Sequence, residues 1–183
     1  MNKRVLIILH PGFEEIEAVT PIDLLVRSDI AVVKSTLGET LDTTGKSGIV
    51  IQAESYLKDV ADEAFDAVVL PGGPGILKIR KHPIICDLFT RQNAANKLIG
   101  CICAAPLLLL DANLLTDVRH TCFPGVKNEL SNALEHTVVQ DGTIITSRGA
   151  GTATQFGLQL IRALIDDATA EKIAASICWE GSV

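Results

Sequence analysis

The stretch LIGCICAAPLLLL, residues 98–110, decides how this chain folds. Residues 98–102 are an apolar run after two polar residues, a pattern typical of a buried strand. Residues 104–106, Ala-Ala-Pro, predict the first turn of a helix, because proline is tolerated where a helix begins. Cys103 therefore lies at the junction of a strand and a helix.

A cysteine at such a junction faces the N-terminal end of the helix. Unpaired N–H groups and the helix dipole favour negative charge there, so we expect the Cys103 thiol to ionise more easily than a free thiol. The thiolate is the nucleophilic form, which makes Cys103 a candidate catalytic residue. The alternative interpretation is that Cys103 is one more small buried hydrophobic residue.

Length and composition predict a single α/β domain over residues 1–183. A hydrophobic content of 48% with only 4% aromatic residues indicates an aliphatic core, as in parallel sheets covered by helices. The net charge of −6, without a cluster of Lys and Arg, argues against a nucleic-acid partner. No apolar run is long enough to span a membrane, and Pro11 and Gly12 end the first apolar run too early for a signal peptide.

Cysteine usage bears on the cellular compartment and on cofactors. The five cysteines are an odd number without a secretion signal, which predicts reduced thiols and a cytoplasmic location. Cys101 and Cys103 alternate on one strand, so a disulfide between them is not expected. Cys and His lack the short paired spacings of zinc sites, and no nucleotide-binding glycine motif is present, so we expect neither metal nor cofactor.

Short apolar strands alternate with helical patterns along the chain. This order predicts a doubly wound sandwich with a mostly parallel central sheet and helices on both faces. Strands are expected at 3–9, 31–36, 67–70, 98–102 and 118–123, and hairpins at 37–52 and 138–146. Helices are expected from residue 13, at 56–65, 83–96 and from 106, after residue 123 through 134, up to 165, and at 168–179.

The helix that starts near Phe13 carries three acidic residues and a proline. We expect the helix to kink or restart at Pro21, which has no N–H to donate. Glu14 and Glu15 are expected to be solvated near the helix N-terminus. Glu17 lies on a flank that can point inward, where burial raises the carboxyl pKa and keeps the group protonated. The alternative is that all three acids simply decorate the first turn.

Several predicted strands end in residues suited to a binding site. In a doubly wound fold the ligand binds at the carboxyl ends of the strands, where His10, Cys103 and the turns 71–75 and 147–152 should meet. The glycine-rich turn 71–75, PGGPG, is expected to offer backbone N–H groups to an oxyanion. His10 can line this site, or its ring can be held by backbone groups.

Four motifs in this order resemble the ThiJ/PfpI superfamily, in particular the Parkinsonism-associated protein deglycases and their bacterial YajL-like relatives. They are GFEEIEAV at 12–19, VVLPGG at 68–73, ICAAP at 102–106 and TSRGAGTATQFGL at 146–158. The resemblance covers nearly the whole chain. It implies a flavodoxin-like α/β fold, a homodimer, and a reactive cysteine beside a protonated glutamate.

The resemblance also implies roles for individual residues. Cys103 matches the reactive cysteine, Glu17 the acid that hydrogen bonds to it, and Gly73 and Ala104 the backbone donors that face the site. The residues expected to line the pocket are His10, Gly72, Phe123, Arg148 and Gly149.

Phe123 matches a position where many members of the superfamily carry a histidine near the cysteine. His120 lies three residues earlier on a predicted strand and so faces the other way. A hydrolytic Cys/His/acid triad is therefore not predicted.

The resemblance motivates three functional hypotheses. In the first, Cys103 attacks the aldehyde carbon of a 2-oxoaldehyde such as methylglyoxal, or of its adduct on a protein or nucleotide, and a hydroxy acid is released. In the second, oxidation of Cys103 to the sulfinate turns the protein into a redox-sensing chaperone that binds unfolding proteins. The third, thiamine thiazole-phosphate biosynthesis, rests on a name that relatives often bear.

Overall fold

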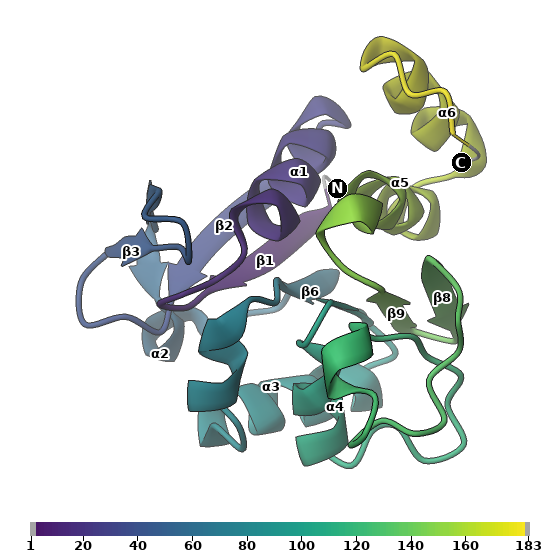
Figure 1. Ribbon diagram of the computed structural model, residues 1–183. Helices are drawn as coiled ribbons and strands as arrows, with labels where there is room; N and C mark the ends of the chain where they lie inside the picture. Colours follow the sequence, from purple (N-terminus) through teal and green to yellow (C-terminus); the bar gives the residue numbers. More distant parts are fainter. Residues whose placement is uncertain (1–2, 182–183) are drawn as a thin grey trace.

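The computed structural model describes residues 3–181 and contains one seven-stranded sheet between two layers of helices (Figure 1). The strand order is β5-β2-β1-β6-β7-β9-β8, and only β8 runs antiparallel to its neighbour. The strands are β1 (Arg4–Leu9), β2 (Ala31–Thr36), β5 (Ser55–Tyr56), β6 (Ala67–Leu70), β7 (Leu98–Ile102), β8 (Val138–Asp141) and β9 (Ile144–Ser147). The predicted flavodoxin-like doubly wound α/β fold is confirmed.

The sheet is apolar on both faces, as parallel sheets covered by helices require. Val5 to Leu9 of β1 are all fully buried, and alternate residues enter different cores. Leu6 and Ile8 pack into the core on one side of the sheet, whereas Val5 and Ile7 pack into the core on the other. The continuous apolar runs in the sequence therefore reflect burial on two sides.

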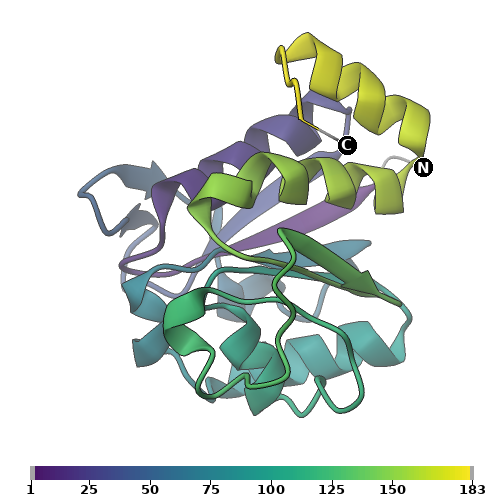
Figure 2. The same cartoon turned by 45° about the vertical axis from the view of Figure 1, so that its right-hand side comes forward.

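Helices α1 (Glu15–Arg27) and α5 (Ala153–Leu164) cover one face of the sheet, and α6 (Asp167–Ser176) packs against α5. The other face is covered by the single turn α2 (Leu57–Val60), α3 (Pro83–Ala94) and α4 (Pro106–Asp111). Figure 2, turned by 45°, shows the same two layers on either side of the strands. Within residues 3–181, no helix is both long and apolar enough to cross a lipid bilayer.

Helix α1 continues through Pro21, so the predicted restart is wrong. Pro21 is buried where α1 crosses α5. A Cβ on Gly157 of α5 would lie 2.6 Å from Leu24 Cδ1 and 3.4 Å from Pro21 Cα. Close packing against a glycine thus accommodates Pro21 within the helix despite the missing hydrogen bond.

The segment after α4 departs most from the prediction. The strand expected at 118–123 is absent from the sheet, and the helix through Leu134 is replaced by the 3₁₀ turn Pro124–Val126. The place beside β9 is taken by β8, and this segment pairs with no strand of the sheet. Side chains hold the segment instead: Thr121 N–H donates to Thr146 Oγ1 at 2.9 Å, and Thr121 Oγ1 donates to Leu134 O at 2.8 Å.

Both predicted hairpins are confirmed. Strands β3 (Asp42–Thr44) and β4 (Val50–Gln52) pair antiparallel outside the main sheet, and β8 pairs with β9 across the Asp141-Gly142 turn. The predicted helix at 56–65 is limited to the four residues of α2. The shortened α2 lies away from the candidate site, whereas the segment around Phe123 borders it.

Candidate active site at Cys103

Cys103 occupies the turn between β7 and α4, in the left-handed backbone region with φ 64°. This conformation is costly for a residue with a side chain and persists only where the surroundings fix it. Cys103 N–H donates to Ser147 O at 2.9 Å, and Cys103 O accepts from Phe123 N–H at 2.8 Å. Neighbouring segments on two sides therefore hold the turn, and the sulfur is half-buried rather than lost in the core.

Glu17 enters the site from the first turn of α1, with only 1% of its surface exposed. Its Oε2 accepts a hydrogen bond from Gly72 N–H at 2.9 Å, and its carboxyl group hydrogen bonds to the Cys103 thiol. Glu14 N–H donates to Gly72 O at 3.0 Å, which docks the start of α1 on the loop after β6. The inward orientation expected for Glu17 is what the structure shows.

The glycines of the PGGPG turn make room for this contact. A Cβ on Gly72 would lie 2.6 Å from Cys103 Cβ and 2.7 Å from Glu17 Oε2. Gly73 has φ 101°, and a Cβ there would lie 2.6 Å from Glu14 N. The backbone can therefore approach the sulfur closely, and the N–H groups of Gly73 and Ala104 donate hydrogen bonds to it. Two backbone donors thus face the thiol.

Burial dominates the ionisation of both groups. It raises the pKa of Glu17 to about 7, with the hydrogen bonds from Cys103 and Gly72 acting in the opposite direction. It also raises the pKa of Cys103 to about 12, and the charge on Glu17 acts in the same direction. The hydrogen bonds from Gly73 and Ala104 lower the thiol pKa but do not outweigh burial. The expectation that Cys103 ionises more easily than a free thiol is therefore wrong.

These two pKa values belong to the pair, because the groups interact directly. Between about pH 7 and about pH 12, Glu17 and Cys103 together keep one proton and carry one negative charge. The hydrogen bond between the carboxyl group and the sulfur places that proton within reach of either atom. The pair can therefore present a thiolate beside a neutral acid.

A cavity of about 480 Å³ opens above the pair. It is lined by Glu14, Glu17, Lys46, Gly73, Pro74, Leu77, Cys103, Ala104, Phe123, Gly125, Val126 and Ala150. Most of this wall is apolar. Its rim carries an ion pair between Lys46 Nζ and Glu14 Oε2, which are 2.6 Å apart.

Five of the predicted site residues therefore meet at one cavity: Cys103, Glu17, Gly73, Ala104 and Phe123.

His10 does not line this cavity. Its ring is fully buried under the 71–75 turn, with Nε2 3.2 Å from Pro71 O, and burial lowers its pKa. A Cβ on Gly75 would lie 2.5 Å from His10 Nδ1, so the turn packs directly on the ring. Of the two interpretations offered by the sequence, the histidine held by backbone is the one observed.

The other predicted lining residues lie behind the wall. Gly72, in the loop after β6, donates its N–H to Glu17 Oε2 at 2.9 Å, and Gly149 lies behind the Phe123 ring, which a Cβ would contact at 3.7 Å. Arg148 turns away and forms an ion pair with Glu135 at 3.1 Å. These three residues border or support the site rather than line the cavity.

Glu14, Lys46 and Leu77 line the cavity but are absent from the sequence-based prediction. Glu14 pairs with Lys46, and Glu15 is buried with its Oε1 accepting from Ser47 N–H at 2.7 Å, so neither acid is solvated as expected. Lys46 comes from the tip of the β3–β4 hairpin, and no pattern in the sequence places that tip beside α1.

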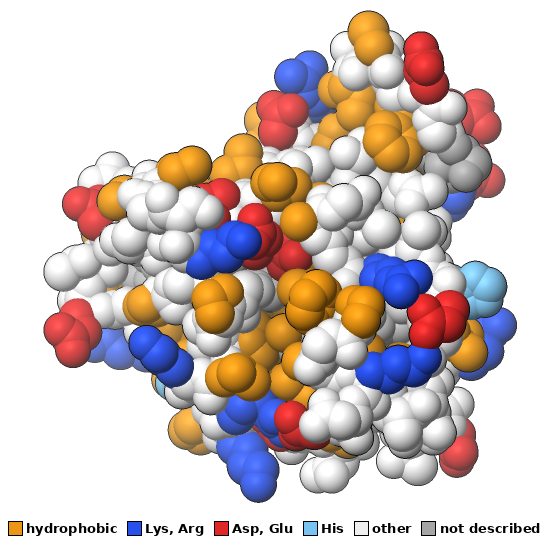
Figure 3. Space-filling model, viewed as in Figure 1, with side chains coloured by type: hydrophobic (Ala, Val, Ile, Leu, Met, Phe, Trp, Pro, Cys, Tyr) orange, Lys and Arg blue, Asp and Glu red, His pale blue; other side chains and the backbone are white. Residues whose placement is uncertain are grey.

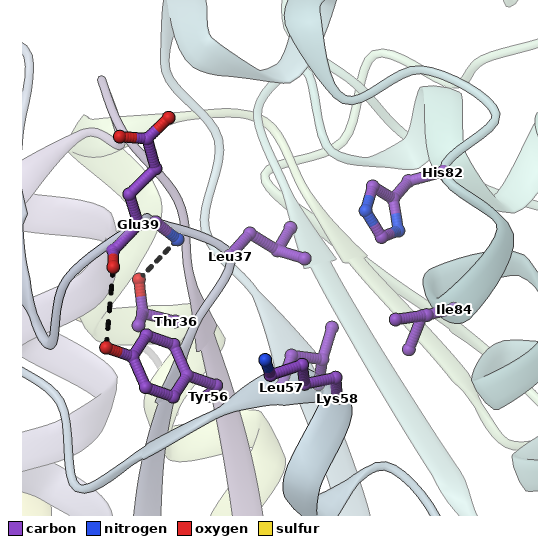
Figure 4. A pocket seen from close by; sticks show the side chains of 9 residues that line it. Thr36, Leu37, Glu39, Tyr56, Leu57, Lys58, His82 and Ile84 are labelled. Atoms are coloured by element: carbon purple, nitrogen blue, oxygen red, sulfur yellow. Dashed lines mark hydrogen bonds between the residues drawn. The ribbon is translucent and has the colours of Figure 1, made fainter.

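A second cavity, of about 380 Å³, lies where β2 and β5 end, near the starts of α2 and α3 (Figure 4). Tyr56 Oη donates to Glu39 O at 3.4 Å at its edge, and His82 and Leu37 flank it. No cysteine lines this cavity. Within residues 3–181, no cluster of three or more His, Cys, Asp or Glu side chains is suited to a metal ion. The candidate chemistry therefore centres on Cys103.

Known proteins are similar to this chain in both sequence and fold. Protein DJ-1 homolog A of Arabidopsis thaliana is 36% identical over 86% of this chain, which spans only 41% of that protein. Glutathione-independent glyoxalase DJR-1.2 of Caenorhabditis elegans is 34% identical over 97% of each chain. The structure of oxidized Toxoplasma gondii DJ-1 superposes with a TM-score of 0.93 at 30% identity, covering 98% of this chain and 100% of that one.

The family model described as DJ-1/PfpI matches residues 3–163. This match covers most of the chain, including the four motifs that carry the resemblance. The chain belongs to the DJ-1/PfpI family, among its DJ-1 homologues.

Proposed function

We propose that the protein converts 2-oxoaldehydes such as methylglyoxal to 2-hydroxy acids by covalent catalysis at Cys103, without a cofactor. The observation that carries this proposal is the hydrogen bond between Glu17 and Cys103 at the floor of an open cavity. A relative 34% identical over nearly its whole length is named a glutathione-independent glyoxalase, which supports the same chemistry.

The reactive form is the thiolate beside a protonated Glu17. The N–H groups of Gly73 and Ala104 point at the sulfur and stabilise negative charge on it. A protonated carboxyl group donates a further hydrogen bond to the sulfur, whereas an ionised one repels the thiolate. Substrate that enters the cavity displaces water from the sulfur and meets the nucleophile there.

The reaction balances without an external oxidant or reductant. The thiolate bonds to the aldehyde carbon, and Glu17 gives its proton to the new alkoxide, forming a hemithioacetal. The Glu17 carboxylate then removes the proton from that carbon, the neighbouring carbonyl carbon receives one, and the hydroxyl proton moves to the neighbouring oxygen, which yields a thioester of the 2-hydroxy acid. Water hydrolyses the thioester, releases the hydroxy acid and restores the thiol.

The same attack applies to early adducts of these aldehydes on amines or thiols of proteins and nucleotides. Such an adduct releases the amine or thiol when Cys103 takes over the carbon, which is a deglycase reaction. The position of the cavity at the protein surface, with Phe123 and Leu77 exposed, suits a substrate that is part of a larger molecule.

Incubation with methylglyoxal tests the enzymatic proposal. We expect lactate to accumulate with the native protein and not with Cys103→Ala, measured by chromatography against authentic lactate. Cys101→Ala is the matched control, because Cys101 is fully buried outside the cavity and its loss leaves the nucleophile in place. Equal lactate with native protein and Cys103→Ala would exclude the proposal.

A redox role for Cys103 is the second candidate. The two backbone donors and the protonated Glu17 that stabilise a thiolate also suit a sulfinate, which carries the same charge. Oxidation at Cys103 would then change the cavity and the binding of unfolding proteins. Mild peroxide followed by mass spectrometry should add two oxygens at Cys103 before the other cysteines, and equal oxidation of all five would contradict this role.

We also infer that the protein forms a homodimer through α1. Ile16, Val19 and Val26 are about half exposed along this helix, and Ile49 and Val50 of the β3–β4 hairpin are equally exposed. Exposed apolar surface of this kind suits a second copy of the chain. The five free cysteines suit a reducing compartment, so we place the protein in the cytoplasm.

A further inference from the structure

The Cys103 cavity is much larger than a three-carbon aldehyde needs. Its volume of about 480 Å³ lies in the range of pockets that hold drug-sized ligands. A substrate that occupies only the floor, near the sulfur, would leave the outer part of the cavity filled with water. The side chains that line the outer part therefore indicate which larger substituents a substrate can have.

The outer wall is made of apolar side chains that the chain leaves in water. Phe123 is 46% exposed and Leu77 is 62% exposed, and Val126 and Pro74 complete the wall. Hydrophobic side chains gather at the centre of the face seen in Figure 3. An exposed apolar wall around a nucleophile favours an apolar group on the ligand.

The Phe123 ring is held in place by two glycines. A Cβ on Gly125 would lie 2.8 Å from Phe123 Cε1, and a Cβ on Gly149 would lie 3.7 Å from Phe123 Cδ2. The backbone of Phe123 is fixed as well, because its N–H donates to Cys103 O at 2.8 Å. The ring and the nucleophile are therefore mounted on the same hydrogen-bonded turn.

The rim offers little to a charged substrate. Its one cation, Lys46, is already paired with Glu14 at 2.6 Å, and the remaining charged group is Glu17 beside the sulfur. An anionic group on a substrate would have to compete with Glu14 for the lysine and would meet carboxylates on both sides. A charged substituent on the substrate therefore binds no better in this cavity than an apolar one.

We propose that the cavity selects aldehydes with an apolar substituent about as large as a phenyl ring, and that Phe123 and Leu77 determine this specificity. The proposal deepens the function proposed above by naming its substrate class. Burying roughly 60 Å² of the substituent against the wall corresponds to about a tenfold preference over a methyl group.

A pair of alkylating agents tests the selectivity without requiring turnover. N-benzyl-2-chloroacetamide and N-methyl-2-chloroacetamide react by the same step, in which the thiolate forms an S–C bond and chloride leaves. Peptide mass spectrometry gives the rate of each agent at Cys103 and at Cys178, which is exposed outside the cavity and serves as the internal reference. We expect the benzyl-to-methyl rate ratio at Cys103 to exceed the ratio at Cys178 about tenfold.

Substitutions then locate the selectivity on the wall. Phe123→Ala and Leu77→Ser should each lower the benzyl-to-methyl rate ratio at Cys103 by about threefold or more. Leu134→Ala is the matched control, because Leu134 is also exposed but does not line the cavity. Equal ratios at Cys103 and Cys178 in the native protein, or ratios unaffected by both substitutions, would overturn the proposal.

Turnover separates this inference from the proposed enzymatic function. We expect kcat/KM for phenylglyoxal to exceed that for methylglyoxal about tenfold, and Phe123→Ala to reduce the difference. Absence of turnover with both aldehydes, together with a high alkylation ratio at Cys103, would refute the enzymatic function and leave the apolar selectivity standing. Turnover that favours methylglyoxal would refute the selectivity alone.

Discussion

Glu17 and Cys103 hydrogen bond to one another beside Gly72, and any side chain at residue 72 would collide with both. The contact joins the first turn of α1 to the end of β7, elements far apart in the sequence. It also means that the chemistry of the sulfur depends on a glycine that never touches a substrate.

Gly72→Ala should disable the site. The added Cβ would lie 2.6 Å from Cys103 Cβ and 2.7 Å from Glu17 Oε2, so the two side chains must separate. We expect a loss of about 2 kcal/mol in the free energy of unfolding and at least a tenfold change in the rate of Cys103 alkylation. Gly151→Ala is the control, since no atom lies within 4 Å of a Cβ there. Similar effects of both substitutions would contradict the role of Gly72.

Glu17→Ala should lower the pKa of the Cys103 thiol, because the charge on Glu17 and its hydrogen bond with the thiol both raise that pKa. Glu17→Gln removes the charge but keeps a polar side chain, and should lower the thiol pKa less. The measurement is the rate of iodoacetamide labelling at Cys103 against pH in the native protein and in both variants. An unchanged pH dependence in both variants would show that Glu17 does not control the ionisation of the sulfur.

Stability should depend on pH through Glu17. Burial raises its pKa from 4.5 to about 7 in the folded protein, so the folded state holds a proton that the unfolded chain has lost between these values. Stability therefore falls as pH rises from 4.5 through 7, by up to about 3 kcal/mol, and is unaffected by this group below 4.5. Urea unfolding across this range should show a smaller decline for Glu17→Gln than for the native protein; parallel curves would contradict the assignment.

Arg80→Ala should destabilise the fold by about 3 kcal/mol. Arg80 donates two hydrogen bonds of 2.7 Å to Asp111, whose side chain is only 2% exposed and would keep only the hydrogen bond from Lys81 N–H. Arg119→Ala removes a pair with Asp141 in which the arginine is 70% exposed, and should change the free energy of unfolding by less than about 1 kcal/mol. Urea unfolding of both variants makes the comparison, and equal losses would refute it.

Val19→Glu should convert the proposed homodimer to a monomer. The substitution places a charge in the middle of the exposed apolar side of α1, where a second copy would have to bury it. Sedimentation equilibrium measures the mass, and Leu110→Glu, on α4 across the sheet, is the control at a comparably apolar position. A native protein that is already monomeric would refute the dimer.

The strands of the sheet could be predicted because their signal is local. Residues 98–102 and 67–70 are apolar runs that begin after the charged residues Lys97 and Asp66, and the structure places both strands at these positions. The segment 118–134 misled the prediction because its β-branched and apolar residues resemble a strand. Whether a ladder is available to it depends on β8, which occurs later in the chain.

Site residues whose positions are set by local backbone geometry could be predicted from the sequence. Properties that depend on burial in the folded protein could not. Cys103 and Gly73 are marked in the sequence by a strand end and a glycine turn. The direction of the shift in the thiol pKa could not be predicted from the sequence, because it depends on how deeply the sulfur and Glu17 are buried. Lys46 and Leu77 come from loops whose positions only the folded chain defines.

The two edge strands of the central sheet affect how readily the protein aggregates at high concentration. In the part of the chain that the structure describes, the outermost strands are β5, of two residues, and β8, of four. Strand β8 gives an approaching chain few free N–H and C=O groups to extend by β-pairing, whereas β5 pairs with only Ser35 and Thr36 of β2. Resistance to aggregation is thus built into the β8 margin of the sheet, away from the chemistry at its centre.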